Sequence, residues 1–361
     1  MRSRSLPVLA LAIVMGAWPL GGAANSVDDV VRAVRDGNRR ELGDEPLAKE
    51  LRKISLDLRL DNRTTEELES EAPGPKSIAE LERLRELTRD LPLPAVLPWF
   101  ASPPIPTMDE LREVLSAARR KTIAYTDNLP DFLCTEMVRR YQVAAGRGSS
   151  PLGNWALEDT LTVQLTYFDH HEEYKLTAMN GRKTMRTYEE VGGAFSRGEF
   201  GSMTYFVFAA ASQAAFKWSN WTTLRKRPTY VLSYQIDIRN SHYRLVAGQS
   251  GRGSDAATVG EHGLVYIDRE TKDVMRVEGE ADTIPNDFLL RAASRSLDYG
   301  PDEVGGRTYL LPLRAVVRMT PRFSPRRVRN EVEFTAYRKF TGESTISFGD
   351  GSAPASPTVK K

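Results

Sequence analysis

The sequence predicts an α+β protein: a large, curved antiparallel β-sheet is covered by helices and preceded by a small all-α region. Two observations support this fold class. After residue 130 most of the chain alternates apolar and polar residues with a period of two, as half-buried strands do. Apolar stripes at helical spacing are confined to the N-terminal part and to two later segments. Many short strands joined by turns, with few helices among them, favour an antiparallel sheet covered by helices.

The first 24 residues predict a secretory signal peptide. Arg2 and Arg4 precede an apolar stretch at 6–20, and small residues follow it up to Ala24, after which we expect cleavage. The apolar stretch is shorter than the roughly 20 residues that a membrane span needs. We therefore expect an exported protein, periplasmic or secreted.

Residues 25–91 are predicted to be helical, because apolar residues recur at helical spacing in VDDVVRAVRD and KSIAELERLRELTRDL. Ser77 and Glu80 match a capping box and predict a helix that begins at Ser77. The turn EAPGPKS resembles a helix-hairpin-helix turn, in which backbone amides hold a phosphate, although Ala72 stands where that motif prefers glycine. A proline–glycine turn between helices is also common for structural reasons alone.

The rest of the chain is predicted to contain a linker, a sheet domain and a tail. Prolines crowd residues 92–106, which predicts an extended linker. Residues 107–348 are expected to form the sheet domain, and residues 349–361 a disordered tail. The sheet domain opens with an amphipathic helix that Thr107 caps and that ends before Pro130. Within this domain the pair Asn180-Gly181 predicts a hairpin turn between two strands.

Two segments of the sheet domain matter for function. The segment 263–281 predicts two strands joined by a charged turn, and its second strand alternates Met275 and Val277 with Arg276. We expect Met275 and Val277 to face the interior and Arg276 to face solvent, so that Met275→Glu is harmful and Arg276→Glu is nearly neutral. The segment 198–216 predicts a helix that lies across the interior from this strand.

If the helices cover the curved sheet only loosely, an apolar cavity remains between them. The residues expected to line this cavity are large or adaptable apolar side chains of the helix and of the inner sheet face. They are Met203, Phe206, Val207, Tyr234, Met275 and Val277.

Several motifs carry a family resemblance. The order of elements in 107–348, and the strand pair LVYIDRETKDVMRVEGE in particular, resembles the lipoprotein-carrier (lipoprotein-sorting) superfamily of bacterial envelopes. The motifs YTDNLPDFLCTEMVRRY, GGAFSRGEFGSM, DYGPDEVGGRTYLLPLRA and FTAYRKFTGESTISF resemble an uncharacterised family of exported bacterial proteins over most of 77–348. The carrier resemblance implies a half-open barrel with a cavity for acyl chains. The family resemblance implies no catalytic residues.

The sequence offers no catalytic, metal or cofactor signature. The chain has 4 histidines, and the adjacent pair His170 and His171 is more typical of a polar turn than of a metal site. No nucleophile elbow, metalloprotease motif or phosphate loop occurs, and the glycine-rich stretch 248–255 lacks the lysine and helix that a phosphate loop needs. The single cysteine, Cys134, is expected to be a buried apolar side chain. We predict no enzyme activity.

Charge narrows the possible partners. The chain has 50 basic and 48 acidic residues, a balance that argues against nucleic-acid binding. Basic runs at 225–227 and 322–329 are expected to be solvated turns or strand edges, or alternatively contacts with anionic lipid headgroups. The sequence therefore predicts an exported carrier for an apolar ligand, such as a lipid or an acyl chain. The alternative is a structural or interaction protein whose core its own helices fill.

Overall fold

The computed structural model describes residues 25–144, 155–168, 171–191, 202–248, 254–324 and 326–340. The chain forms two compact units, which divide between Pro98 and Trp99. The division falls within the proline-rich segment 92–106, which contains no helix or strand. The predicted signal peptide and the predicted tail lie outside the described residues.

The first unit is helical. Its helices are α1 (Val27–Arg39), α2 (Asp44–Arg52), α3 (Asn62–Glu71) and α4 (Pro75–Thr88). Apolar side chains at helical spacing are fully or almost fully buried in this unit, which confirms the predicted small helical region. They include Val27, Val30, Val34, Leu47, Leu51, Leu68, Leu81 and Leu84.

Helix α4 does not begin where the capping pattern predicts. It begins at Pro75 with Gly74 as its N-cap, because a proline in the first helical turn loses no hydrogen bond. Ser77 is buried inside the first turn, and its hydroxyl donates to the Asp44 carboxylate at 2.7 Å. The prediction of Ser77 as the N-cap is therefore wrong.

The same aspartate bears on the resemblance to a phosphate-binding turn. Its carboxylate accepts hydrogen bonds from the backbone amides of Lys76 (2.9 Å) and Ser77 (2.7 Å). Desolvation raises the pKa of Asp44, but the bonds from Ser77 and Lys76 outweigh it and lower that pKa overall. A side chain of the same unit thus occupies the amides that would hold a phosphate, which supports the structural interpretation of this turn.

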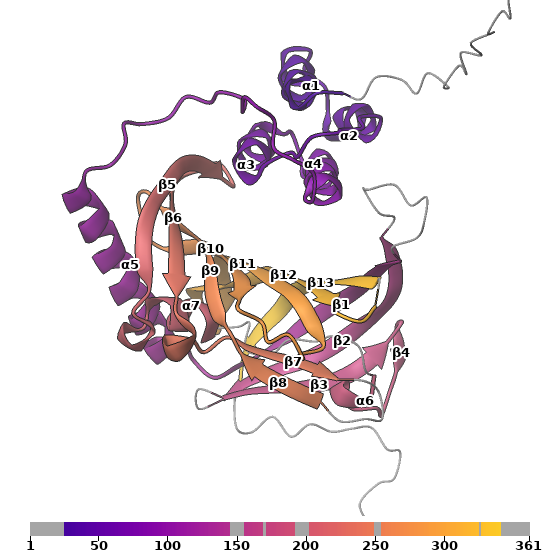
Figure 1. Cartoon of the computed structure of the whole chain (residues 1–361), viewed down its shortest axis with the longest axis vertical. Coiled ribbons are helices and arrows are strands. Elements are labelled where there is room, and N and C mark those ends of the chain that lie inside the picture. Colours follow the sequence, from indigo (N-terminus) through magenta and orange to yellow (C-terminus); the bar gives the residue numbers. More distant parts are fainter. Residues whose placement is uncertain are drawn as a thin grey trace, which may run out of the picture. The chain divides into compact units, whose positions relative to one another are not determined.

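The second unit is built on an antiparallel sheet, which in the described part of the chain has 11 strands in the order β4-β3-β2-β1-β13-β12-β11-β10-β9-β6-β5 (Figure 1). The bounds are β1 Phe132–Ala144, β2 Ala156–Phe168, β3 His171–Met179, β4 Arg182–Lys183, β5 Ala215–Leu224, β6 Arg227–Ile236, β9 Gly260–Asp268, β10 Val274–Asp282, β11 Leu290–Val304, β12 Arg307–Pro321 and β13 Arg326–Lys339. The last strand, β13, inserts between β1 and β12 and so joins two meanders into one sheet. The sheet is open, with β4 and β5 at its edges, which confirms the predicted fold class.

The remaining elements lie on or beside the sheet. They are α5 (Met108–Asn128), α6 (Tyr188–Val191), α7 (Ser202–Phe208), the short 3-10 helices Ala210–Ser212 and Ile238–Asn240, and a separate hairpin of β7 (Arg244–Gly248) and β8 (Ser254–Thr258). The predicted hairpin turn at Asn180-Gly181 is present between β3 and β4, and both residues have positive φ angles (50° and 73°).

The main hydrophobic core lies on one face of this curved sheet. A single cluster of buried side chains extends from Leu176 on β3 to Trp221 on β5 and includes residues of α5 and α7. A sheet with one apolar face must cover that face, and here the two helices do so. Figure 1 shows the sheet curving beside α5 and α7.

The helix predicted at 198–216 is shorter in the structure. Helix α7 ends at Phe208, and strand β5 already begins at Ala215. The Ser212 hydroxyl donates to the backbone carbonyl of Ala209 at 2.8 Å, and Gln213 takes a left-handed φ of 48°, so the chain turns away from the helix. Residues 198–201 lie outside the described part of the chain.

Candidate ligand-binding site

Helix α5 forms one wall of the candidate site. The Thr107 hydroxyl accepts a hydrogen bond from the Glu110 amide at 3.2 Å, which confirms the predicted cap. The helix ends where Leu129 becomes extended ahead of Pro130, as expected. Its buried apolar stripe faces the sheet and comprises Leu111, Val114 and Ala118.

A cavity of about 170 Å³ lies between α5, α7 and strands β10 to β12. Its lining is mostly apolar, with several hydroxyl groups and one ion pair. The lining residues are Lys121, Thr122, Tyr125, Thr204, Asp273, Val274, Tyr299 and Leu310. They come from segments that are far apart in the sequence and are brought together by the way α5 and α7 lie across the sheet.

The hydroxyl groups of the cavity differ in their hydrogen bonding. Thr204 on α7 donates to the hydroxyl of Tyr299 on β11. The hydroxyl of Tyr125 on α5 is buried and has no hydrogen-bond partner among the described residues. Burial raises the pKa of both tyrosines, so both phenols stay protonated at physiological pH. The interior of the cavity is therefore neutral and offers a hydrogen-bond donor on Tyr125.

An ion pair forms the rim of the cavity. The Nζ atom of Lys121 lies 2.8 Å from a carboxylate oxygen of Asp273, and the two side chains are 50% and 32% exposed. Exposed ion pairs contribute little to stability, typically about 0–1 kcal/mol, because water screens them. This rim can therefore open at small cost.

The turn that carries Asp273 is well ordered by Asp268. The Asp268 carboxylate accepts hydrogen bonds from the amides of Glu270 (2.9 Å) and Thr271 (2.7 Å) and from the Arg227 guanidinium. Burial raises the pKa of Asp268, but Arg227 and Thr271 outweigh it and lower that pKa to about 2. The position of Asp273 at the rim is thus fixed by a hydrogen-bonded turn.

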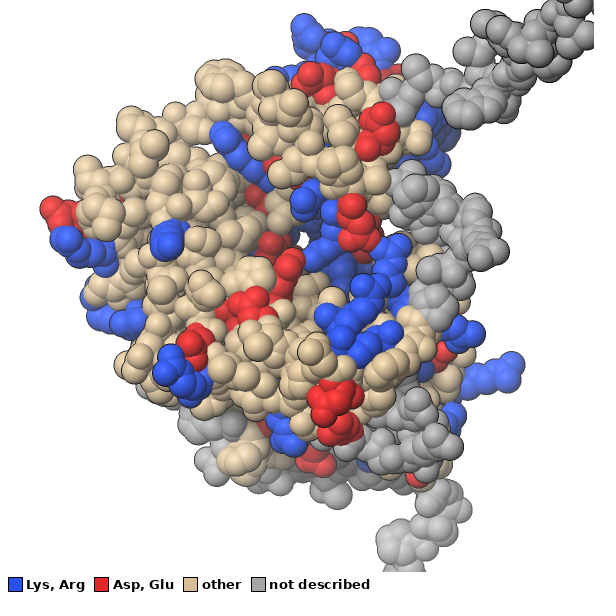
Figure 2. Space-filling view, in the orientation of Figure 1, with Lys and Arg blue, Asp and Glu red and all other residues tan. Residues whose placement is uncertain are grey.

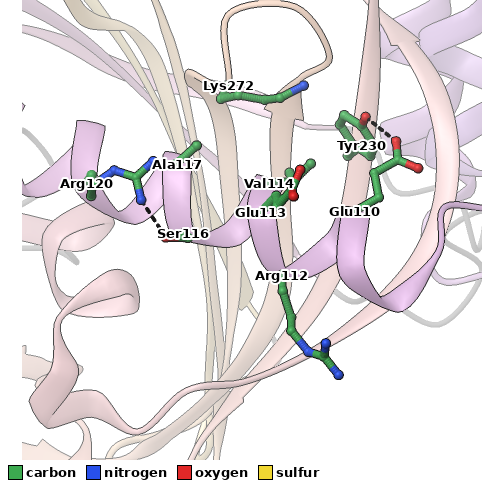
Figure 3. A pocket seen from close by; sticks show the side chains of 9 residues that line it. All are labelled: Glu110, Arg112, Glu113, Val114, Ser116, Ala117, Arg120, Tyr230 and Lys272. Atoms are coloured by element: carbon green, nitrogen blue, oxygen red, sulfur yellow. Dashed lines mark hydrogen bonds between the residues drawn. The ribbon is translucent and has the colours of Figure 1, made fainter.

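A second depression, of about 620 Å³, lies along another flank of α5 (Figure 3). Charged and polar side chains dominate its lining, which makes it a poor site for an apolar ligand. In Figure 3 Glu110 and Tyr230 point toward each other, and the Tyr230 hydroxyl donates to Glu110 at 2.7 Å. The Nζ atom of Lys272 lies 5.1 Å from the centre of the Tyr230 ring. We assign this depression to the contacts that hold α5 on β6 and the β9–β10 turn.

The six residues predicted to line a cavity are placed differently from the observed lining. Met203, Val207, Tyr234 and Val277 are buried in the main core cluster. Phe206 is half-buried and stacks on the His242 ring at 4.3 Å. None of the six is among the lining residues of the 170 Å³ cavity in the described part of the chain.

Met275 and Arg276 correct the predicted strand faces. A register shift between Val274 and Arg276 marks a bulge in β10, so Val274 and Val277 share the core face while Met275 packs in a different cluster with Tyr266. Arg276 is only 4% exposed. The prediction that it faces solvent is wrong, because its guanidinium pairs with the buried Asp298 carboxylate at 2.6 Å.

The predicted basic runs are partly structural. Arg225 donates to Asp298 at 3.0 Å and to the backbone carbonyl of Tyr299 at 2.6 Å. Arg322 donates to backbone carbonyls, including that of Phe288 at 3.0 Å. Figure 2 shows Lys and Arg side chains gathered in the region of β12, β13 and β1. Arg225 and Arg322 therefore serve the fold, and contact of the basic runs with lipid headgroups stays a prediction.

The other chemistry-bearing residues give no second site. Cys134 is buried, and burial raises the pKa of its thiol, so it is a poor nucleophile. His171 begins β3, whereas His170 and the central part of the glycine-rich stretch, 249–253, lie outside the described residues. Within the described ranges, no group of three or more His, Cys, Asp or Glu could hold a metal ion.

Sequence reasoning missed the residues that do line the cavity. Thr122 lies one turn after Ala118 on the apolar stripe of α5, and Tyr125, almost one turn further along, continues that stripe. Tyr299 alternates with Leu297 on β11 and so shares its core face. These signals were present in the sequence, but only the packing of α5 and α7 shows that the residues meet.

Comparisons with known proteins give distant similarities. No protein-family model matches the chain, and no curated protein matches it. A domain proposed to be an outer membrane lipoprotein-sorting protein, from Vibrio parahaemolyticus, is similar in structure with a TM-score of 0.30 and 14% identity, over 64% of this chain and 94% of that one. A DUF1329 family protein from Desulfovibrio piger is similar with a TM-score of 0.30 and 8% identity, over 66% of this chain and 97% of that one. The resemblance to lipoprotein-carrier proteins that the sequence predicted is thus found in the structure as a distant similarity, from which no function follows.

Proposed function

We propose that the unit from Trp99 onward binds an apolar ligand, a lipid or an acyl chain, between α5, α7 and the sheet, and holds it as a carrier module. The observation that carries this proposal is the mostly apolar cavity under α5, which has neutral hydroxyl groups inside and an ion pair at its rim. Apolar walls with a few polar groups are the usual composition of a small-molecule site.

The cavity is small, so an apolar ligand could enter only if the site opens. Its volume of about 170 Å³ is below the roughly 300–1,000 Å³ of sites that enclose drug-sized ligands. A full acyl chain would therefore require α5 to move away from the sheet. The Lys121–Asp273 pair at the rim is exposed enough to separate readily, which supports α5 as the element that moves.

The chemistry of the cavity favours binding over catalysis. Burial raises the pKa of its two tyrosine hydroxyls, so neither tyrosine supplies a ready base or nucleophile. We extend the proposal to an exported protein on the basis of residues 1–24. None of the described helices is long and apolar enough to cross a membrane.

One observation favours the alternative of a structural or interaction protein. The main core is a single continuous cluster from β3 to β5, and the cavity inside it is small. In that case α5 and α7 would be permanent cover for the sheet, and no apolar ligand would enter.

Titration of the chain from Asn25 onward with a polarity-sensitive fluorescent fatty acid separates the two functions. We expect saturable binding that Val274→Phe abolishes, because the larger side chain fills the cavity. Val316→Phe is the matched control, since Val316 is also nearly buried but does not line the cavity. Absence of saturable binding with a chain that melts cooperatively would favour the structural role.

A further inference from the structure

We propose that the cavity recognises the uncharged carbonyl of a fatty acyl ester, and that the Tyr125 hydroxyl is the donor that binds the carbonyl oxygen. This inference rests on the proposed apolar-ligand function and names its ligand class. It makes Tyr125 a binding residue, because its hydroxyl would touch the ligand directly.

The first step is the state of the Tyr125 hydroxyl. It is buried, it lines the cavity, and no described residue accepts its proton. Buried donors in proteins almost always have a partner, and one without a protein partner calls for an explanation. Burial raises the pKa of this phenol, so the proton that it could donate stays in place over the physiological range.

The second step is the kind of acceptor. An ionised carboxylate inside the cavity would need a compensating positive charge. Among the described lining residues the positive charge of Lys121 is balanced by the negative charge of Asp273, so a bound carboxylate would leave the site with a net negative charge. A neutral carbonyl needs one donor and no counter-charge, which Tyr125 provides.

The third step is the surroundings of the carbonyl. Val274 and Leu310 give the cavity apolar walls on the sheet side, which suit the methylene groups next to the carbonyl. Thr204 donates a hydrogen bond to the Tyr299 hydroxyl, so these two side chains form a polar part of the wall that is hydrogen-bonded within the protein. The cavity thus fits the carbonyl end of the ligand, and the rest of the chain would pass under α5 as that helix moves.

The test uses two ligands that differ in one carbonyl group: methyl laurate and dodecyl methyl ether. Each displaces a bound uncharged probe, the methyl ester of a fluorescent fatty acid, from the chain starting at Asn25, from Tyr125→Phe and from Tyr205→Phe. Tyr205 is the control because it neighbours the cavity residue Thr204 on α7 but is not among the cavity-lining residues. We expect the ester to bind more tightly than the ether by about threefold to tenfold, the usual range for one net hydrogen bond, and Tyr125→Phe alone to abolish this difference.

The outcomes separate this inference from the proposed function. Equal affinities for ester and ether in the unchanged protein would overturn the role of Tyr125 and leave the apolar-ligand function standing. Tighter binding of laurate anion than of its methyl ester would overturn the uncharged acceptor. If no ligand displaces the probe because the probe never binds, both proposals fail. Thermal melting supplies an independent measurement: Tyr125→Phe should melt at or above the temperature of the unchanged protein, and a clear fall would show that the hydroxyl has a protein partner.

Discussion

Leu297 and Asp298 are neighbours on β11 and lie on opposite faces of the sheet, yet they are only 1% and 6% exposed. Leu297 belongs to the main apolar core. Asp298 is held by arginines, with Arg276 at 2.6 Å and Arg225 at 3.0 Å. Both faces of β11 are therefore buried at this point, with Leu297 in apolar packing and Asp298 in ion pairs. The alternation of apolar and charged residues therefore shows which residues share a face of the strand. It does not show which face is exposed to solvent.

The electrostatics of the charged face follow from this arrangement. Burial raises the pKa of Asp298, but Arg276, Arg225 and Arg314 outweigh it and hold that pKa well below its ordinary value. The carboxylate is ionised at every pH at which the protein is expected to work. The fold tolerates this buried negative charge only while the paired arginine side chains remain beside it.

Removing the carboxylate is expected to have the largest effect. Asp298→Ala leaves buried guanidinium groups without their counter-charge, and breaking a buried pair in this way typically costs about 3–5 kcal/mol. Chemical denaturation followed by circular dichroism measures the change in the free energy of unfolding. Glu303→Ala is the control, because Glu303 is an exposed carboxylate on the same strand, and its loss should stay within about ±0.5 kcal/mol. Equal effects of the two variants would mean that the charged face is solvated after all.

On the apolar face, shortening Leu297 is expected to lower the free energy of unfolding by a similar or smaller amount. The pH dependence of this loss should differ from that of Asp298→Ala. Leu297→Ala removes buried methyl groups and leaves a cavity, at a cost of about 2–5 kcal/mol. This cost should not change with pH. Because the pKa of Asp298 is depressed in the folded state, its contribution is fully present above the unfolded value of about 3.9 and is lost at lower pH. Unfolding measured from pH 7 to pH 2.5 should therefore show a shrinking penalty for Asp298→Ala and a constant one for Leu297→Ala.

The sequence predicted the sheet, the helix that starts after Thr107 and the hairpin at Asn180-Gly181, because these rest on local periodicity and local turn chemistry. It did not predict the bulge at Met275, since one extra residue in a strand leaves no mark in the alternation of side chains. The residues that line the observed cavity were not predictable either. Tyr125 and Tyr299 are far apart in the chain and meet only through tertiary packing.

Asp268, at the end of β9, tests whether a second buried carboxylate of the sheet unit stabilises the fold in the same pH-dependent way as Asp298. Asp268→Asn keeps the shape of the side chain but loses the ion pair with Arg227, and we expect a cost of about 1–3 kcal/mol. The pKa of Asp268 is about 2 in the folded protein against an ordinary 3.8, so its stabilisation is present above pH 3.8 and is lost as the pH falls toward 2. Thermal melts at pH 7 and pH 2.5 should therefore show a larger difference between variant and unchanged protein at pH 7. A difference that stays constant would place the effect in backbone geometry and not in charge.

The smallest effect on stability is expected at the rim of the cavity. Lys121→Gln removes the ion pair with Asp273, and because both side chains are substantially exposed the cost should stay below about 1 kcal/mol. If the rim restrains α5, the same change should speed both the association and the release of a fluorescent fatty acid in stopped-flow measurements. Arg120→Gln is the control: Arg120 is the preceding residue on α5, it bonds to Ser116, and it does not line the apolar cavity. Faster exchange in Lys121→Gln alone would identify the rim as a gate, whereas equal rates in both variants would mean that α5 opens elsewhere along its length.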